Sequence, residues 1–253
     1  MNETLIAQVF DTLRRQFKER ADPLRAQSVK NYFKEPIVTY GLSVPQVRTL
    51  ARAYLPQLKK EATLEDVLVL CERLLATGSL EEGLAVETLM GPFVKRLTPE
   101  HFPILDRWVD YFSNWAVTDG VSAHIIGALL ERHPELVERL VSWTASHSRW
   151  RRRAACVSLV LPVRHDSVSL RQLFAITDPL MLDRDDMVQK GAGWILRDMS
   201  ALHQDDVVEY LQKYPAAGRI LVRYVLEKMP AAKRAIFITD RSARGSSSSL
   251  KVS

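Results

Sequence analysis

Two pairs of tryptophans in this chain repeat with a fixed offset of 35 residues. Trp108 and Trp115 lie seven residues apart, and Trp143 and Trp150 keep that spacing 35 positions later. A fixed period of roughly 20–50 residues is typical of stacked helical units, in which each unit buries its apolar face only against its neighbours. The feature therefore predicts an all-α chain, folded as a solenoid of stacked helix pairs.

Helical periodicity along the rest of the chain agrees with this prediction. Val121, Ile125 and Leu129 follow the i, i+4, i+8 spacing of one helix face. The one short β-like run, residues 37–40, is enclosed by a proline and a glycine, and we interpret it as a loop.

Helix-start signals divide the chain into units. Residues 98–100 (TPE) and 133–135 (HPE) each place a proline in the first turn of a helix. After a helical N-terminal region we expect helix pairs near residues 64–97, 99–131, 134–164, 168–201 and 204–229. We expect residues 1–240 to form a single domain. The serine-rich segment 241–253 has almost no apolar content and is predicted to be a disordered tail.

Composition sets broad limits on the class of protein. The chain has 253 residues, 47% of them hydrophobic, which is enough to bury a sizeable core. An excess of five basic over acidic side chains and a pI near 9.2 modestly favour a polyanionic partner. Cys71 and Cys156 lie in apolar helical runs, which predicts buried, reduced thiols. We expect a cytoplasmic protein, because there is neither a signal peptide nor an apolar run of the ~18 residues that span a bilayer.

The repeat brings residues from three distant segments onto one helix face. A third unit aligns when residues 187–198 are shifted by 37 positions onto residues 150–161. In this shared frame six side chains follow the i, i+3, i+4, i+7, i+10 spacing of one continuous face, which we place on the concave side of the solenoid. They are Trp115, Asp119, Arg153, Lys190, Trp194 and Arg197.

This combination of indoles and cations favours nucleic acid as the ligand. Lysine and arginine neutralise phosphates, and indoles stack on sugars or bases. Arg149 and Arg152 belong to a run of four arginines within five residues, RWRRR. Successive helical residues turn by about 100°, so only some of these guanidiniums face one ligand. We expect a basic groove in which Arg149, Arg152, Arg153, Lys190 and Arg197 contact DNA.

Structural interpretations of the same residues remain open at this stage. Tryptophans in helical repeats often pack between units, and an aspartate beside arginines is often a structural ion pair. The arginine run is equally compatible with a solvated surface patch. The six histidines show no paired metal-ligand spacing, and no phosphate-binding or nucleophile-elbow motif is present, so we expect neither a metal nor a cofactor.

Four segments resemble the AlkD-like DNA glycosylases of the DNA alkylation repair family, which are built from HEAT-like repeats. Three of them carry the face described above, and their order and separations fit across roughly residues 1–230. The segments are SNWAVTD (113–119), WRRRAA (150–155), QKGAGWILRD (189–198) and, more weakly, YGLSVPQVR (40–48).

The resemblance implies a role for each residue of the face. Trp115 and Asp119 fall on the family's catalytic tryptophan and aspartate, Trp194 on its second lesion-facing tryptophan, and Arg153 on its backbone-binding arginine. Ser28 stands where an aromatic residue of the family can face the lesion, and Ala116 stands where the family often has an acidic residue. The resemblance also implies a right-handed solenoid of HEAT-like helix pairs with a concave basic groove.

The function implied is base excision repair by a monomeric, monofunctional glycosylase. The family excises cationic N3- and N7-alkylated purines from double-stranded DNA without a metal or cofactor, and without flipping the base into a pocket. Asp119, Trp115 and Trp194 are then the catalytic residues. Two alternatives are a non-catalytic repeat protein that recognises damaged or branched DNA and a protein-interaction scaffold in which the tryptophans anchor a peptide.

Overall fold

The computed structural model describes residues 2–237 and is helical throughout, as predicted. Within this range no β-strand forms, and an isolated bridge joins Val38 to Ser79 in the segment interpreted as a loop. None of the described helices is long and apolar enough to cross a bilayer. The predicted tail, residues 241–253, lies outside the described residues.

Each helix pair expected from the sequence is present. Short 3₁₀ segments join several helices, and a π-helical segment continues α8 into α9. The α-helices are α1 (Glu3–Glu19), α2 (Pro23–Tyr32), α3 (Val44–Arg52), α4 (Leu55–Glu61), α5 (Leu64–Ala76), α6 (Leu80–Met90), α7 (Phe102–Trp108), α8 (Trp115–Val121), α9 (Gly127–Arg132), α10 (Val141–Thr144), α11 (Arg149–Val157), α12 (Val160–Arg164), α13 (Leu170–Thr177), α14 (Asp186–Met199), α15 (Gln204–Gln212) and α16 (Arg219–Leu226).

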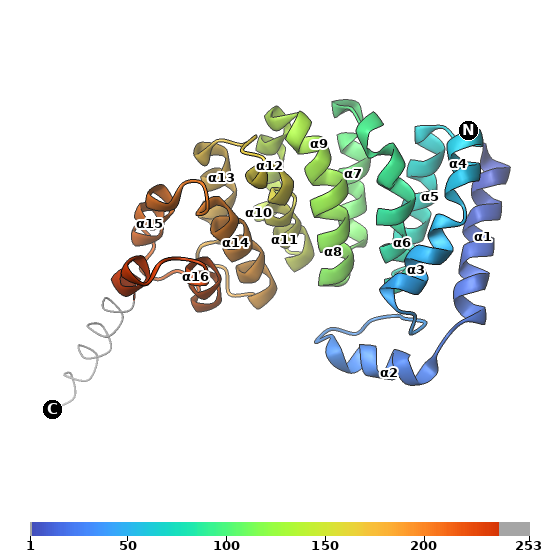
Figure 1. Cartoon of the computed structure of the whole chain (residues 1–253), viewed down its shortest axis with the longest axis horizontal. Coiled ribbons are helices and arrows are strands. Elements are labelled where there is room, and N and C mark those ends of the chain that lie inside the picture. The colour runs from blue at the N-terminus through green and yellow to red at the C-terminus, as the bar shows by residue number, and fades with distance from the viewer. Residues whose placement is uncertain (1, 238–253) are drawn as a thin grey trace.

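The pairs lie side by side in one row that runs from α1 to α16 (Figure 1). One layer of the row is formed by the later helix of each pair, with successive contacts α3–α6, α6–α8, α8–α11, α11–α14 and α14–α16. Contacts α1–α5, α5–α7 and α10–α13 belong to the other layer. All six residues of the predicted face are carried by three consecutive helices of the first layer, α8, α11 and α14.

Two of the repeating tryptophans are core residues, and Trp143 packs on the preceding unit, one of the alternatives left open by the sequence. Trp108 and Trp143 are fully buried, and Trp143 stacks on Phe102 with 6.0 Å between ring centroids. The indole Nε1 of Trp143 donates a hydrogen bond of 2.6 Å to Asp106 Oδ1. The 35-residue period therefore reports core packing at these positions.

Both cysteines are free and buried, as expected. Burial raises the pKa of Cys156 to about 12, and it raises the pKa of Cys71 as well. Both thiols therefore stay protonated at neutral pH and act as small apolar groups of the core.

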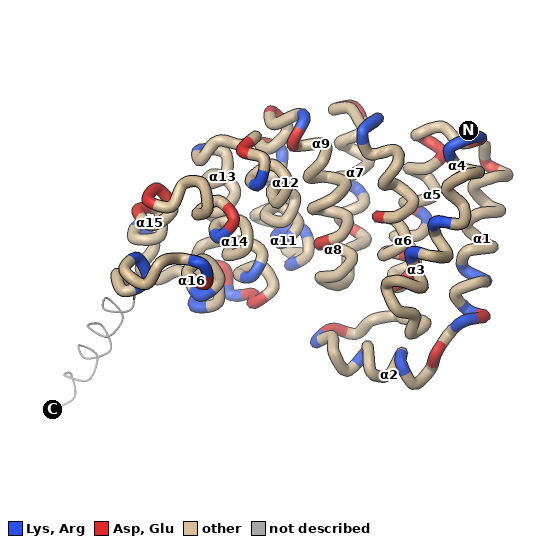
Figure 2. Tube along the Cα trace, viewed as in Figure 1, with Lys and Arg blue, Asp and Glu red and all other residues tan. Residues whose placement is uncertain are grey.

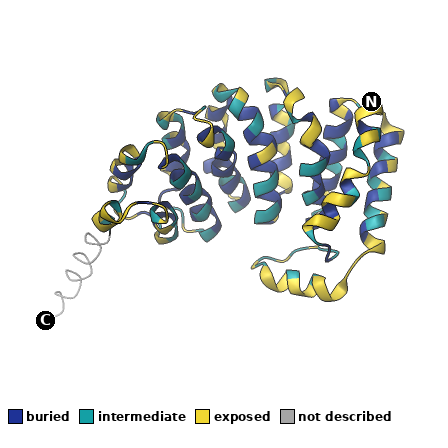
Figure 3. Cartoon of the chain, viewed as in Figure 1, coloured by how far each residue is buried: buried dark blue, intermediate teal, exposed yellow. Residues whose placement is uncertain are grey.

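Helix α2 lies apart from the row and buries none of its own residues (Figures 1 and 3). Its position depends on the loop that follows it. The buried carboxylate of Glu81 accepts hydrogen bonds from Thr39 Oγ1 and from the backbone N–H groups of residues 40, 41 and 42, at 2.7–3.0 Å. Gly41 has φ +83°, and a Cβ there would lie 2.3 Å from the carbonyl oxygen of Asp22, so only glycine fits between loop and helix.

Replacing Glu81 with alanine should therefore destabilise the protein. The change leaves several buried N–H donors without an acceptor, and each such donor costs roughly 1–3 kcal/mol. We expect Glu81→Ala to lower the free energy of unfolding by about 3 kcal/mol in urea denaturation. Glu138→Ala, at an exposed position, is the control. Equal stability of the two variants would contradict the assigned role of Glu81.

Candidate active site

The predicted face lines one hollow of about 470 Å³. Helices α8, α11, α14 and α16 and the end of α2 form its walls. All six residues that the repeat frame placed together are among its lining, which comprises Tyr32, Lys34, Trp115, Asp119, Arg153, Met187, Lys190, Trp194, Arg197 and Tyr224. Asp119 is therefore accessible from the hollow, and the two indoles share it.

Asp119 is held by a bidentate ion pair with Arg153. Arg153 Nε donates to Oδ1 and Nη2 donates to Oδ2, each at 2.7 Å. The remaining terminal nitrogen, Nη1, donates to the backbone carbonyl of Met187 at 2.5 Å. The guanidinium is buried, with 7% of the Arg153 side chain exposed against 19% for Asp119. The arginine thus fixes the carboxylate, while lone pairs of both oxygens remain for a ligand.

Local sequence explains how the pair is built. Asn114 caps α8, since its side chain accepts from Val117 N at 3.0 Å, and this starts the helix at Trp115. On α14, a Cβ at Gly191 would lie 3.3 Å from Arg153 Cγ. The absence of a side chain at Gly191 therefore lets α11 and α14 approach closely around the guanidinium.

Trp115 is packed against two aromatic residues that the sequence analysis did not identify. Phe33 stacks on it at 5.5 Å between centroids with planes 19° apart, and Tyr32 meets it edge-on at 6.2 Å. The resemblance directed attention to Ser28, one turn earlier on α2. The two consecutive aromatic residues at the end of α2 could have indicated an aromatic contact with the site. The repeat frame does not include α2, so it could not place them beside Trp115. Phe33 leaves at most one face of Trp115 free for a ligand.

Trp194 is oriented by Asp198. Its Nε1 donates to Asp198 Oδ2 at 3.0 Å, and Arg164 pairs with the same oxygen at 2.9 Å. Arg197 pairs with Asp198 at 3.3 Å and with Glu227 at 3.1 Å. Asp198 therefore acts on the hollow indirectly, by fixing the second indole and one of the predicted cations.

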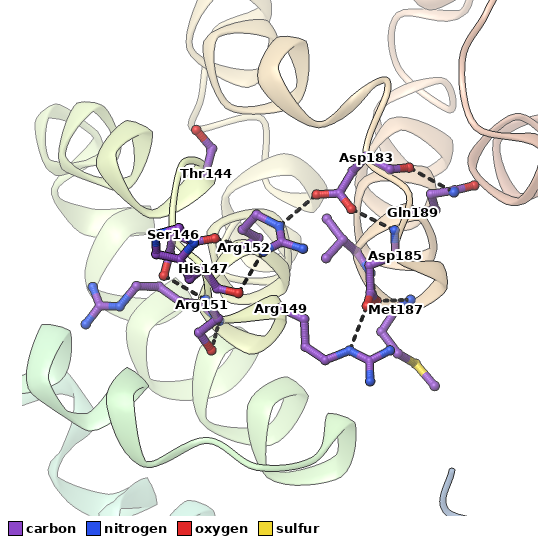
Figure 4. Close-up of polar contacts among 12 residues, drawn as sticks. Thr144, Ser146, His147, Arg149, Arg151, Arg152, Asp183, Asp185, Met187 and Gln189 are labelled. Carbon is purple, nitrogen blue, oxygen red and sulfur yellow. Dashed lines mark hydrogen bonds and ion pairs between the residues drawn. The ribbon is translucent and has the colours of Figure 1, made fainter. Parts of the chain in front are cut away.

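The other two predicted DNA contacts do not line this hollow. Arg149 forms an ion pair with Asp185 at 2.8 Å, and Arg152 forms one with Asp183 at 2.7 Å (Figure 4). Arg152 also donates to the carbonyl oxygens of Ser146 and His147. The side chains of the arginine run diverge, as the helix turn predicts. Asp183 lies in the loop before α14 and Asp185 is the N-cap of that helix, whereas Arg151 pairs with Asp106 and Asp110.

Lys190 differs from the predicted arginines. It lines the hollow, and its side chain has no hydrogen-bonding or ionic partner among residues 2–237. Lys34 lies on the opposite wall and forms a long, exposed ion pair of 3.6 Å with Asp186. In the described part of the chain no three His, Cys, Asp or Glu side chains come together in a way that could hold a metal ion.

Comparison with known proteins identifies the family. Residues 13–229 match the sequence profile of the family described as DNA alkylation repair enzyme. This match covers most of the chain, and the chain belongs to that family. Membership supports a role in DNA repair, with DNA as the substrate.

A solved structure provides an independent comparison of the fold. The structure described as "Predicted DNA alkylation repair enzyme from Enterococcus faecalis" aligns with a TM-score of 0.72 over 83% of this chain and 97% of that one. The two sequences are 19% identical, so the likeness shows a shared fold alone. No curated protein matches this chain.

The ion pair between Asp119 and Arg153 should contribute to the stability of the fold. Arg153→Ala leaves the partly buried Asp119 carboxylate and the Met187 carbonyl without their donors. Removal of one partner of a buried pair costs about 3–5 kcal/mol, and partial exposure of Asp119 reduces this to roughly 2–3 kcal/mol. Urea denaturation measures the loss, with Arg171→Ala, at an exposed position, as the control.

A second substitution tests the cause of that loss. Asp119→Asn in the Arg153→Ala background removes the stranded charge, so it should restore part of the stability. If Arg153→Ala behaved like Arg171→Ala, or if the double variant were the less stable of the two, the ion pair would not support the fold.

Proposed function

We propose that this protein is a DNA glycosylase that hydrolyses the N-glycosidic bond of cationic N3- or N7-alkylated purines in double-stranded DNA. The observation that carries the proposal is the Asp119 carboxylate, held from behind by Arg153 and accessible from a hollow that two indoles share. Family membership supports the DNA repair setting.

Chemistry of the lesion explains why one carboxylate suffices. Alkylation at N3 or N7 makes the purine a cation, so it departs as a neutral base and needs no general acid. The enzyme must stabilise the sugar cation that forms and position a water for attack. Asp119 can serve both needs, since a carboxylate attracts the cation and accepts a hydrogen bond from the water.

The ion pair with Arg153 sets the size of this effect. A unit charge pair at about 4 Å and an effective dielectric near 20 is worth roughly 4 kcal/mol. A guanidinium at about twice that distance removes half of the attraction and leaves roughly 2 kcal/mol. The range of 2–4 kcal/mol corresponds to about 30- to 1,000-fold in rate. A modest factor of this size suits labile cationic lesions and is too small for neutral bases.

The remaining residues are assigned roles around Asp119. Trp194 and the free face of Trp115 offer cation–π attraction of roughly 0.5–2 kcal/mol to the charged base or sugar. Lys190 lies where a phosphate beside the hollow could be neutralised. Arg153 uses three of its five N–H groups within the protein, so we assign it mainly to holding Asp119, with two hydrogens left for a backbone phosphate.

Asp119→Asn tests the catalytic role. The amide loses the charge that stabilises the sugar cation and leaves the charge of Arg153 uncompensated. We expect release of 3-methyladenine and 7-methylguanine from methylated duplex DNA to fall about 30- to 1,000-fold or more, with binding of undamaged DNA kept. Free bases are quantified by chromatography.

Asp110→Asn is the matched control for that experiment. Asp110 is exposed and pairs with Arg151 outside the hollow, so the same chemical change should leave base release near the wild-type rate. Wild-type rates in the Asp119 variant would refute the role of Asp119.

Trp194→Ala tests the role of the indole. Loss of cation–π attraction should lower the rate of base release at saturating DNA by about 2- to 30-fold. Leu202→Ala removes an exposed apolar side chain just beyond α14 and should have no effect. An unchanged rate for Trp194→Ala would remove this residue from the site.

A non-catalytic DNA-binding protein is the second candidate function. The observation in its favour is the bidentate pairing of Asp119, which neutralises part of the charge that catalysis needs. This candidate gives salt-sensitive binding of duplex DNA by the wild-type protein and no release of methylated bases, so the base-release assay separates the two.

A further inference from the structure

The arginines that the sequence marked as DNA contacts are already neutralised inside the protein. Arg149, Arg152, Arg153 and Arg197 each pair with one or more carboxylates at 2.7–3.3 Å. Affinity for duplex DNA depends on cations that replace the counterions of phosphates. A guanidinium that stays paired with a carboxylate brings little net charge to that exchange. Basic side chains without a carboxylate partner are therefore better suited to bind the DNA backbone.

Unpaired arginine side chains gather on α16, the next helix of the same layer. Arg219 and Arg223 are exposed, and neither side chain has a carboxylate or other hydrogen-bonding partner in the range 2–237. Together with the exposed Arg234 they line a second hollow of about 930 Å³. Figure 2 shows basic segments along α16, at the end of the row next to α14.

The second hollow adjoins the candidate active site. Neighbouring residues of α14 and α16 line the two hollows. Gln189 and Arg223 line the second hollow, and the next residue of each helix, Lys190 and Tyr224, lines the first. The two carboxylates in the second hollow, Asp186 and Glu227, are paired with Lys34 and Arg197. The arginines of α16 thus carry uncompensated positive charge directly beside the site.

The placement of these arginines does not serve the helix itself. Arg219 and Arg223 are four residues apart, and like charges at this spacing destabilise a helix. Arg219 also lies in the first turn of α16, where the helix dipole disfavours a cation. Both features become favourable when an anion lies against this face.

Helix α16 packs directly against α14 and is joined to it by the side chain of Gln189. Gln189, which is buried, donates from Nε2 to the carbonyl of Asp183 at 2.9 Å and accepts from Ile220 N at 3.2 Å. A Cβ at Gly218 would lie 2.3 Å from Gln189 Oε1, so the glycine allows this contact. The packing of the two helices therefore fixes where the backbone of Arg219 and Arg223 lies relative to Lys190.

We propose that Arg219 and Arg223 of α16, together with Lys190 of α14, neutralise backbone phosphates of the duplex that flanks the candidate active site, and that the run from Arg149 to Arg152 does not. This inference rests on the proposed function, since it takes duplex DNA as the partner. It assigns the electrostatic part of binding to residues on the C-terminal side of the site.

The test is the salt dependence of binding to an undamaged duplex, measured by fluorescence anisotropy. Each phosphate contact contributes about 0.9 to the slope of log K against log salt. The double variant Arg219→Gln/Arg223→Gln should flatten this slope by about 2 and weaken binding roughly 10- to 100-fold at 0.1 M salt.

Two controls accompany the double variant. Lys59→Gln/Lys60→Gln removes the same charge from exposed residues of α4, near the opposite end of the row, and should leave the slope unchanged. Arg149→Gln should also leave it nearly unchanged. Thermal denaturation establishes that each variant is folded.

The outcomes separate this inference from the proposed function. If the wild type releases methylated bases but the α16 double variant keeps its slope, or if Arg149→Gln flattens the slope as much, the inference is overturned alone. If the Lys59/Lys60 control flattens the slope equally, the slope depends on the net charge of the protein and not on these positions, and the inference also fails. A wild-type protein that binds no duplex DNA overturns both.

Discussion

The bidentate pair between Asp119 and Arg153 is the interaction on which the site depends. It joins α8 to α11, and through the Met187 carbonyl it reaches α14, so three consecutive helices of one layer meet at one guanidinium. A buried arginine with three donors in use has little freedom to move. The carboxylate therefore keeps one position without help from a ligand. The geometry that the proposed catalytic role requires is built by the fold itself.

The same pair also limits what the site can do. Arg153 reduces the field that Asp119 presents to the hollow, so the attraction available for a sugar cation is a few kcal/mol at most. Lesions whose base is already a cation need no more than this, because their bond breaks readily. In the proposed function, the stability of the carboxylate and the selectivity for labile substrates thus have one physical origin.

The sequence predicted well the layer that carries α8, α11 and α14, and it predicted the surroundings of that layer poorly. The tryptophan period and the alignment of units placed Trp115, Asp119 and Trp194 in one hollow, because repeats keep equivalent residues on one face. Tyr32 and Phe33 were missed since α2 lies outside the repeat frame. The sequence left open a structural ion pair at Asp119, and the structure contains it. The partners of Arg149 and Arg152 could not be foreseen, because they lie at the start of α14 and in the loop before it, which no periodicity describes.

The wall of the hollow formed by α2 differs in kind from the wall formed by α14. Helix α2 buries none of its own side chains, whereas α14 is largely buried and packed on both neighbours of its layer. The end of α2 meets Trp115 through two ring contacts and α14 through one exposed ion pair, whereas its start is joined to the loop after it by a hydrogen bond of 2.9 Å from Asp22 N to the carbonyl of Tyr40. The wall at the end of α2 is therefore held less firmly than the wall formed by α14. In the proposed function, the aromatic wall is thus the side of the hollow that is held least firmly against a duplex, and the spacing of Asp119 and Trp194 is the part that the packed helices fix.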